Sequence, residues 1–304
     1  MSLEVTGHDE VQDVLRALGP GAHSLLFAGP DAVGRAPTAR WYAALRNCAD
    51  PASAPCGRCD ACRRMAAGTH PDLMYKRPEA TTRAGRSSRR PMLRIDQMVP
   101  REGPRMDPEP LSRWLAHRPQ GRVRVGVVDD AHTLNPQAGN AFLKVLEEPP
   151  SWAVVILIAP GPEAVLPTLA SRCLTVRFGA APTGGFEDLA PHPALRSGQV
   201  GRLIRAREAP EAEAHMQGRV ADWVAALDGP LGPALTAGAA LVEAWTERPD
   251  LAPAERVLAH LRRDDPSRYP TALDAVRRAE EALAAYVSPT VVAHALTLRL
   301  RRVR

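Results

Sequence analysis

Short apolar runs alternate with stretches of helical periodicity over roughly the first 180 residues of the chain. Five of these runs predict β-strands, at residues 24–28, 72–75, 123–128, 153–158 and 175–178. The third and fourth runs contain few polar residues, which is typical of strands buried on both faces of a parallel sheet. An alternation of strands and helices predicts an α/β domain.

After residue 210 the pattern changes to apolar residues at helical spacing. Helices are predicted at residues 216–227, 233–246, 254–261, 270–286 and 290–301. Between the two regions, residues 182–209 are at first rich in glycine and proline, and only residues 195–206 predict a good helix. The carboxy-terminal part is therefore expected to form a separate all-helical unit.

Composition adds few constraints. The 304 residues are 45% hydrophobic, which is enough for two or three compact units. The first residues have neither the basic flank nor the apolar core of a signal peptide, and no apolar run approaches the roughly 20 residues of a membrane span. We therefore expect a cytoplasmic protein without membrane contact. The net charge of +5 permits contact with nucleic acid but does not require it.

Four of the five cysteines fall within fifteen residues, with the spacing C-x7-C-x2-C-x2-C. In a reducing cytosol such a cluster favours metal binding over disulfides. Thiolates two residues apart can reach one ion from a tight turn, and four sulfur ligands leave no position for a reactive water. A structural zinc site is predicted, with the ligands Cys48, Cys56, Cys59 and Cys62. The alternative is a loop with free cysteines; Cys173 stands apart.

The segment Gly-Pro-Asp-Ala-Val-Gly-Arg-Ala, which begins at Gly29, has the outline of a phosphate-binding loop between a strand and a helix. Gly29 and Gly34 have the spacing of that motif. However, Arg35 replaces its lysine, Ala36 replaces the hydroxyl that binds magnesium, and Asp31 adds negative charge. Losing two charge-assisted contacts of roughly 1.5–3 kcal/mol each weakens binding about a hundredfold or more. We therefore expect no useful ATP binding; the alternative is a chance glycine turn after a strand.

The apolar run 123–128 ends in Asp129 and Asp130, a pattern that in nucleotide-hydrolysing sheets holds magnesium and polarises water. Asp130 stands where glutamate is usual, so its shorter side chain would be withdrawn from an attacking water. Because the preceding loop is already altered, we interpret the pair as strand-end hydrogen-bond acceptors. Further along, Arg172 precedes the last predicted strand, where a side chain can project from the rim of the domain.

Residues 76–105 contain nine basic and three acidic residues. This excess of positive charge predicts either a surface that binds nucleic acid or a segment that is simply exposed to solvent. The second interpretation is favoured because no aromatic side chains are interleaved. Within this stretch, residues 81–90 are rich in Arg, Ser, Thr and Gly and predict a loop.

Together these features make the sequence resemble the delta-prime subunits of the bacterial DNA polymerase III clamp loader, a family of the AAA+ superfamily. The resemblance covers roughly the first 180 residues. Besides the cysteines it rests on His23-Ser-Leu-Leu-Phe-Ala-Gly-Pro30, His70-Pro-Asp-Leu73, Ile95-Asp-Gln97, Asn140-Ala-Phe-Leu-Lys-Val-Leu-Glu-Glu-Pro-Pro150 and Leu166-Pro-Thr-Leu-Ala-Ser-Arg-Cys173. The combination of the cysteines, the Leu-Glu-Glu-Pro-Pro run and the Ser-Arg-Cys triplet is highly specific.

The resemblance implies an AAA+ domain with a parallel five-stranded sheet at residues 1–180, carrying a zinc-binding insertion at 48–62. It implies a small helical lid at 181–212 and a helical oligomerisation domain, the collar, at 213–304. It also implies a five-membered ring that opens the sliding clamp and places it on primed DNA. In such a ring the chain would contact the tau/gamma motor subunits and the delta subunit, as a stator that does not hydrolyse ATP.

Under this resemblance Arg172 is an arginine finger that reaches the ATP of a neighbouring subunit, so ATP would bind only at that interface. The strand end Ile158-Ala-Pro160 lacks the polar residue that senses the terminal phosphate in active members, which agrees with an empty site in this chain. Two alternatives stay open. One is an active ATPase motor subunit of the clamp loader, and the other is a zinc-bearing nucleic-acid adaptor that uses residues 76–105.

Overall fold

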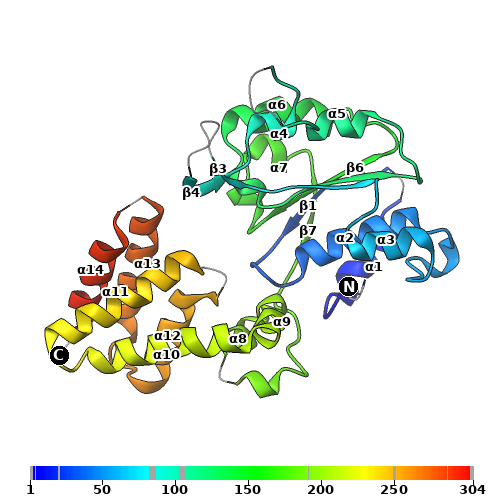
Figure 1. Cartoon of the computed structure of the whole chain (residues 1–304). Helices are drawn as coiled ribbons and strands as arrows, with labels where there is room; N and C mark the ends of the chain where they lie inside the picture. Colours follow the sequence, from blue (N-terminus) through cyan, green and yellow to red (C-terminus); the bar gives the residue numbers. More distant parts are fainter. Residues whose placement is uncertain are drawn as a thin grey trace. The chain divides into compact units, whose positions relative to one another are not determined.

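The computed structural model describes residues 3, 5–19, 21–81, 87–102, 107–190, 192–248, 251–285 and 287–301. The chain divides into two compact units, Met1–Pro182 and Thr183–Arg304, most of whose helices and strands are labelled in Figure 1. Each unit encloses its own apolar core, as is typical of domains.

Five strands of the first unit form one parallel sheet in the order β2-β5-β6-β1-β7. Their bounds are β1 (Ser24–Ala28), β2 (Leu73–Lys76), β5 (Arg124–Val128), β6 (Ala153–Ala159) and β7 (Leu174–Arg177). The strands coincide with the five apolar runs to within a few residues, so the predicted parallel five-stranded sheet is confirmed. The central strand β6 is buried at every position, as expected for a strand covered on both faces.

Alternate residues of β6 contribute to two cores, one on each face of the sheet. Val154, Ile156 and Ile158 pack into one core, and Val155 and Leu157 into the other. The first face is covered by α1 (Asp9–Ala17), α2 (Arg35–Asn47) and α3 (Asp60–Ala67), and the second by α4 (Ile95–Met98), α5 (Leu111–Ala116), α6 (Pro136–Glu147) and α7 (Pro167–Ala170). A sheet covered by helices on both faces is the α/β arrangement predicted from the sequence.

A small antiparallel hairpin, β3 (Glu79–Thr81) and β4 (Ser87–Met92), forms a second sheet. The sequence predicted a loop over residues 81–90, and that prediction is wrong for Thr81 and for residues 87–90. Residues 82–86, which join the two strands, lie outside the described residues. Single turns of 3-10 helix occur at η1 (Pro51–Ser53), η2 (Ala131–Thr133), η3 (Pro162–Ala164) and, in the second unit, η4 (Glu187–Leu189).

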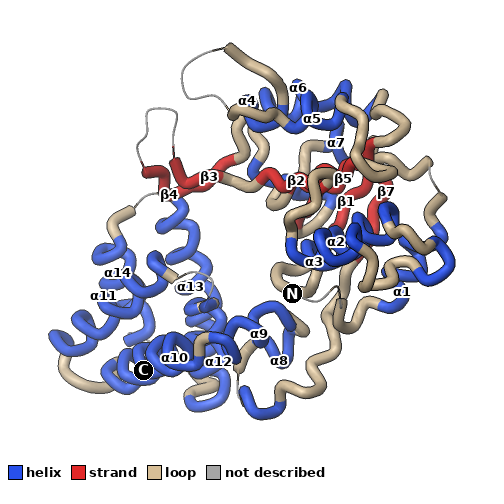
Figure 2. The backbone as a smooth tube through the Cα atoms, turned by 45° about the vertical axis from the view of Figure 1, so that its right-hand side comes forward, coloured by secondary structure: helices blue, strands red, loops and turns tan. Residues whose placement is uncertain are grey.

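The second unit is helical, as the blue elements of Figure 2 show. Its helices are α8 (Ala194–Ser197), α9 (Val200–Glu208), α10 (Pro210–Ala226), α11 (Leu231–Glu247), α12 (Pro253–Asp264), α13 (Tyr269–Ala284) and α14 (Pro289–Arg301). In its core the Trp223 indole N–H of α10 donates to Thr297 Oγ1 of α14 at 3.0 Å. Gly238 of α11 lies so close that a Cβ there would overlap the Thr297 hydroxyl. The predicted all-helical region is confirmed, and glycine at this position permits its tight packing.

The boundary between the two units follows Pro182. The predicted lid and collar both lie within the second unit, with η4, α8 and α9 before residue 210 and the longer helices after it. The division of this unit at residue 212 stays a prediction. Among the described residues, no helix combines the length and apolar character needed to cross a membrane.

Candidate nucleotide-loop, arginine and metal sites

The loop between β1 and α2 keeps the shape of a phosphate cradle. Gly34 has a φ of 118° and directly precedes the first residue of α2, and Ala32 has a φ of 57°. The imidazole Nε2 of His8 lies 2.6 Å from the Val33 carbonyl oxygen, which ties the loop to the segment before α1. Left-handed backbone suits glycine and is uncommon for alanine, so this short loop is locally constrained.

Packing requires Gly29 in this loop. Its N–H donates to the Ala159 carbonyl oxygen at 3.2 Å, at the end of β6. A Cβ at this position would overlap the carbonyl oxygen of Phe178, just after β7. The first glycine of the motif therefore has a structural reason to be present whether or not a phosphate ever binds.

Arg35 points its charge inward, toward the carboxylates of the site. The residue is only 6% exposed, and its Nη2 lies 3.5 Å from Oδ1 of Asp31. Burial lowers the pKa of Arg35, while the carboxylates of Asp31, Asp129 and Asp130 act in the opposite direction. Its Nη1 has no hydrogen-bond partner within the described part of the chain. The guanidinium thus supplies, from within the chain, positive charge that a nucleotide site receives from lysine and magnesium.

The two strand-end carboxylates also interact with the chain's own groups. Arg77 Nε donates to Oδ2 of Asp129 at 3.2 Å. Asp130 adopts a φ of 53° and its carbonyl oxygen accepts from the Thr133 N–H at 2.8 Å, which starts η2. Burial and the neighbouring Asp129 raise the pKa of Asp130. The structure therefore brings together Arg35, Asp129 and Asp130, the predicted residues of the altered site; their roles stay predictions.

Arg172 lies immediately beyond α7 and is held by three groups. Its Nε donates to Oε1 of Glu147 at 2.7 Å, and its Nη1 donates to the Thr168 carbonyl oxygen at 2.9 Å and to Ser171 Oγ at 3.4 Å. The side chain remains 35% exposed. Sequence reasoning identified Arg172 but missed Glu147, the last residue of α6, although it belongs to the quoted Leu-Glu-Glu-Pro-Pro run. The guanidinium is thus both accessible and fixed in direction.

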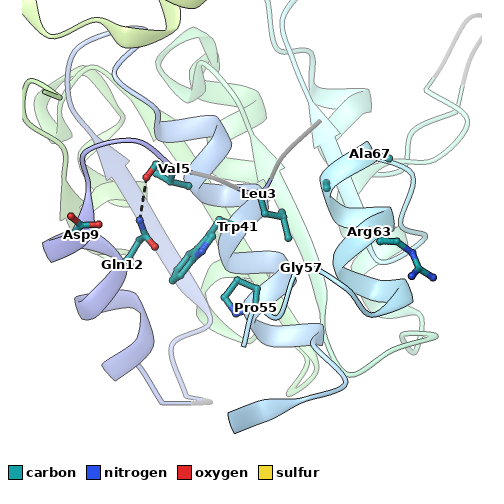
Figure 3. Close-up of a pocket in the computed structure, with 10 residues that line it drawn as sticks. Leu3, Val5, Asp9, Gln12, Trp41, Pro55, Gly57, Arg63 and Ala67 are labelled. Atoms are coloured by element: carbon teal, nitrogen blue, oxygen red, sulfur yellow. Dashed lines mark hydrogen bonds between the residues drawn. The ribbon is translucent and has the colours of Figure 1, made fainter. Parts of the chain in front are cut away.

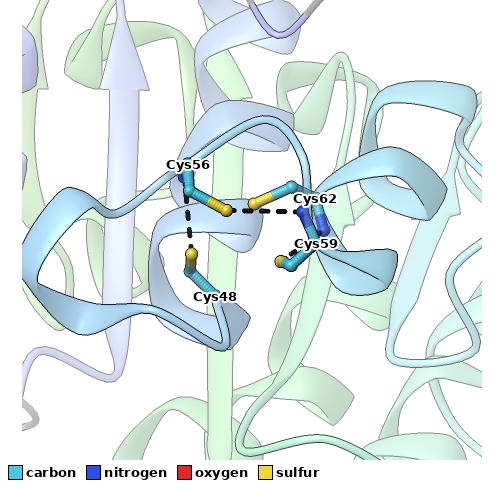
Figure 4. A group of neighbouring side chains, drawn as sticks. All are labelled: Cys48, Cys56, Cys59 and Cys62. Carbon is cyan, nitrogen blue, oxygen red and sulfur yellow. Dashed lines mark hydrogen bonds between the residues drawn. The ribbon is translucent and has the colours of Figure 1, made fainter.

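The four clustered cysteines converge on one point, as Figure 4 shows. Their Sγ atoms all lie within 4.8 Å of one another. Backbone N–H groups of Cys56, Cys59 and Cys62 donate to the preceding sulfur of the cluster, each at 3.4 Å. Four sulfurs at ~2.3 Å from one zinc ion would be ~3.8 Å apart, so small side-chain movements complete a tetrahedron. The residues fit a structural zinc ion.

The electrostatics of the cluster favour thiolates at its more exposed positions. Backbone N–H groups of Cys59 and Arg58 lower the pKa of Cys56 to about 6. Burial raises the pKa of Cys62, so this thiol needs a nearby cation to ionise. A zinc ion would supply that cation and would link the end of α2 to α3. Cys173 lies outside the cluster, and burial raises its pKa to about 12.

A cavity of about 670 Å³ borders the cysteine segment (Figure 3). Trp41, Pro55 and Gly57 form part of its wall, and Gln12 Nε2 donates across it to the Val5 carbonyl oxygen at 3.4 Å. Neither the glycines of the loop nor the strand-end carboxylates line this cavity. It is therefore separate from the nucleotide-like loop.

Three basic residues of the 76–105 segment, Lys76, Arg77 and Arg94, are paired with carboxylates, whereas the exposed Arg101 has no carboxylate partner among the described residues. Lys76 Nζ lies 2.7 Å from Oδ2 of Asp107, and Arg94 contacts both Glu79 and Asp96. Arg83, Arg86 and Arg105 lie outside the described residues. Pairing of these three residues within the chain agrees with the interpretation as a solvent-exposed segment, which stays a prediction.

Comparison with known proteins places the chain in a family. Residues 16–182 match the family model described as DNA polymerase III, delta subunit. The DNA polymerase III subunit delta' of Pseudomonas aeruginosa is 36% identical over 155 residues, which is 50% of this chain and 42% of that protein. The subunit delta' of Bacillus subtilis is 27% identical over 167 residues, or 55% of this chain and 45% of that protein.

The DNA polymerase III subunit gamma/tau of Mycobacterium tuberculosis is 33% identical over 174 residues, covering 56% of this chain and 27% of that protein. The chain thus spans less than half the length of these relatives. A crystal structure of a DNA polymerase III gamma subunit-related protein from Thermotoga maritima aligns with 97% of this chain and 100% of its own, at 15% identity and a TM-score of 0.48. The family match extends over more than half of the chain, which therefore belongs to the delta-prime subunit family of the DNA polymerase III clamp loader.

Proposed function

We propose that this chain is a non-hydrolysing stator of the clamp loader, which supplies Arg172 as an arginine finger to ATP bound by a neighbouring subunit. One observation carries the proposal. The chain holds one arginine, Arg172, accessible and directed, while it buries another, Arg35, beside the Asp31 carboxylate of its own loop. The proposed role requires both features: an arginine that can reach the ATP of a neighbouring subunit, and a nucleotide-like loop whose own arginine is already paired within the chain.

The neutralised loop explains why the chain would not hydrolyse ATP itself. A triphosphate brings about four negative charges, and the only nearby buried guanidinium described, Arg35, already contacts Asp31 and is influenced by Asp129 and Asp130. Binding would require Arg35 to leave these carboxylates and phosphate to approach them, which Coulomb repulsion opposes. The missing lysine and hydroxyl remove the contacts that compensate for such repulsion in active sites.

The partners follow from the family. Relatives are named as subunits delta', tau and gamma/tau of DNA polymerase III. We propose that this chain assembles with the tau/gamma motor subunits and the delta subunit, through a collar at residues 213–304, and acts on the sliding clamp and primed DNA in the cytoplasm. The proposed zinc ion at the four cysteines is structural and takes no part in hydrolysis.

The test is reconstitution of the complex with Arg172→Ala. Arginine fingers contribute on the order of 10³–10⁵ in rate at the site they serve, so DNA-stimulated hydrolysis at that interface and clamp loading should fall sharply. Arg113→Ala is the matched control, because Arg113 is exposed on α5 of the same unit and has no ion pair among the described residues. Unchanged clamp loading by a complex that contains Arg172→Ala would refute the finger.

A second measurement tests the chain's own loop. The isolated chain is titrated with a fluorescent ATP analogue in the presence of magnesium, and no saturable binding that depends on both magnesium and Asp129 is expected at micromolar concentrations. Magnesium-dependent binding with a micromolar Kd that is lost on changing Asp129 would instead support the active motor subunit.

A further inference from the structure

The second unit contains a cavity of about 410 Å³ with an unusual distribution of charge. Six of its lining residues are arginine or histidine, and no aspartate or glutamate is among those that line it. These six are His192, Arg196, Arg256, His260, Arg262 and Arg263. They come from the segment around α8 and from α12, which are distant in sequence and lie in the same unit.

The inner end of the cavity is a fixed, buried arginine. Arg256 is only 4% exposed; its Nε donates to the Leu251 carbonyl oxygen at 2.7 Å, and its Nη1 donates to Oε1 of Gln217 at 3.2 Å. Its Nη2 contacts the Glu213 carboxylate and lies 2.8 Å from Nε2 of His192. The charge of Arg256 is therefore balanced by Glu213, and its position is set by backbone and side-chain partners from other elements.

The outer part carries positive charge that is not balanced. Arg196 and Arg262 are exposed, and neither has a carboxylate partner among the residues that the structure describes. The guanidinium of Arg262 instead lies over the Tyr269 ring, 5.7 Å from its centroid. Asp264 is the partner of two other lining residues: Arg263 makes two contacts of 2.7 Å to it, and His260 Nε2 lies 3.2 Å from its Oδ2. Two unpaired guanidinium groups thus border a cavity whose inner arginine is already held in place.

From this arrangement we infer that the cavity is a binding site for a small anion that carries two or more phosphate groups. Guanidinium groups present paired N–H donors that match phosphate oxygens, and unpaired cations around one hollow repel each other until an anion enters. A volume of about 410 Å³ lies within the usual range of small-ligand pockets, about 300–1,000 Å³, and exceeds what one phosphate fills. The inference concerns binding to the helical unit and does not depend on the clamp-loader role of Arg172.

The experiment is calorimetric titration of the full chain with tripolyphosphate at low salt. The native chain is expected to bind one equivalent, and Arg196→Ala and Arg262→Ala are each expected to weaken binding about tenfold, since each removes a charge-assisted contact. Arg205→Ala is the matched control: Arg205 lies in the last turn of α9, as Arg262 lies in the last turn of α12, and it is outside the cavity. The control should bind like the native chain.

Two comparisons complete the design. ATP is titrated next to tripolyphosphate, because a nucleotide carries the same phosphate chemistry, and equal sensitivity of both ligands to Arg262→Ala supports the site. Absence of tripolyphosphate binding by the native chain, or an equal loss in Arg205→Ala, overturns the inference. A single-stranded oligonucleotide that binds through Arg196 and Arg262 while tripolyphosphate does not would also overturn it, in favour of nucleic acid.

Discussion

Replacing Asn47 with alanine should destabilise the first unit far more than the small size of the Asn47 side chain suggests. Asn47 is the last residue of α2, is 5% exposed and directly precedes the cysteine cluster. Its Oδ1 accepts from the N–H groups of Arg122 and Val123, both at 3.0 Å, and its Nδ2 donates to the carbonyl oxygens of Val123 at 2.9 Å and Ala43 at 3.1 Å. One amide thus joins the end of α2 to the start of β5.

The magnitude follows from the groups that the substitution leaves without partners. Val123 is 9% exposed, so its N–H and C=O would both lose hydrogen bonds in a nearly dry environment. An unsatisfied buried polar group costs about 1–3 kcal/mol, whereas the N–H of the exposed Arg122 can turn to water at little cost. We therefore expect Asn47→Ala to lower the free energy of unfolding by about 3 kcal/mol.

Hydrogen exchange of β5 peptides measures this directly, because a loss of about 3 kcal/mol lowers amide protection about a hundredfold. Asn135→Ala is the matched control: Asn135 makes one side-chain bond, accepting from the Ala138 N–H at 2.8 Å as the N-cap of α6. Its removal should cost about 1 kcal/mol. If the two variants lost protection equally, or if Asn47→Ala lost less than about 0.5 kcal/mol, the reasoning about Val123 would be wrong.

Three further predictions concern the metal cluster, the arginine and a buried carboxylate. Chelation, or Cys59→Ser, should release one zinc ion per chain and lower the melting temperature; a colorimetric zinc assay and a thermal melt measure both, and an unchanged melt would argue against a structural ion. Glu147→Ala should barely alter stability, because the exposed pair with Arg172 is worth about 0–1 kcal/mol, yet should slow ATP hydrolysis in the reconstituted complex; an unchanged rate would show that Glu147 does not position the finger. Burial raises the pKa of Asp96, but hydrogen bonds from Arg94 and a backbone N–H outweigh burial and leave the pKa below its usual value. Its contribution to stability is therefore complete above the usual pKa of about 4 and disappears as the pH falls through the lower folded value, so acid unfolding curves of Asp96→Asn and the native chain should differ at pH 7 and converge well below pH 4.

The fold was predictable where burial imposes a simple pattern. β6 is apolar at every position because helices cover both of its faces, and such a run can be recognised without knowledge of its neighbours. β4 could not be recognised in this way. Its sequence, Ser-Ser-Arg-Arg-Pro-Met, is mostly polar, and its pairing with β3 is a tertiary property that no periodicity records.

The same distinction holds for the sites. The four cysteines were predictable as a cluster because ligands two residues apart must be close in space, whatever the rest of the chain does. The partner of Arg172 was not, because Glu147 is 25 residues away and only the packing of α7 against α6 brings the two together. The burial of Arg35 was likewise not predictable: its nearest carboxylate, Asp31, is only four residues away, but Asp129 and Asp130, which also raise its pKa, lie about a hundred residues further along the chain.

The loop between β1 and α2 shows why a phosphate-binding outline persists in a segment that we propose does not bind ATP. Gly29 is required by the close approach of Phe178, and Gly34 adopts the left-handed conformation that starts α2. Both requirements come from packing within the first unit and would remain if no phosphate were ever bound. The positive charge of Arg35, which a phosphate would otherwise neutralise, instead lies 3.5 Å from the Asp31 carboxylate, so this loop needs no nucleotide to balance that charge. The stator role that we propose needs this independence, because Arg172 could then stay in one place while the neighbouring subunits go through their ATP cycle.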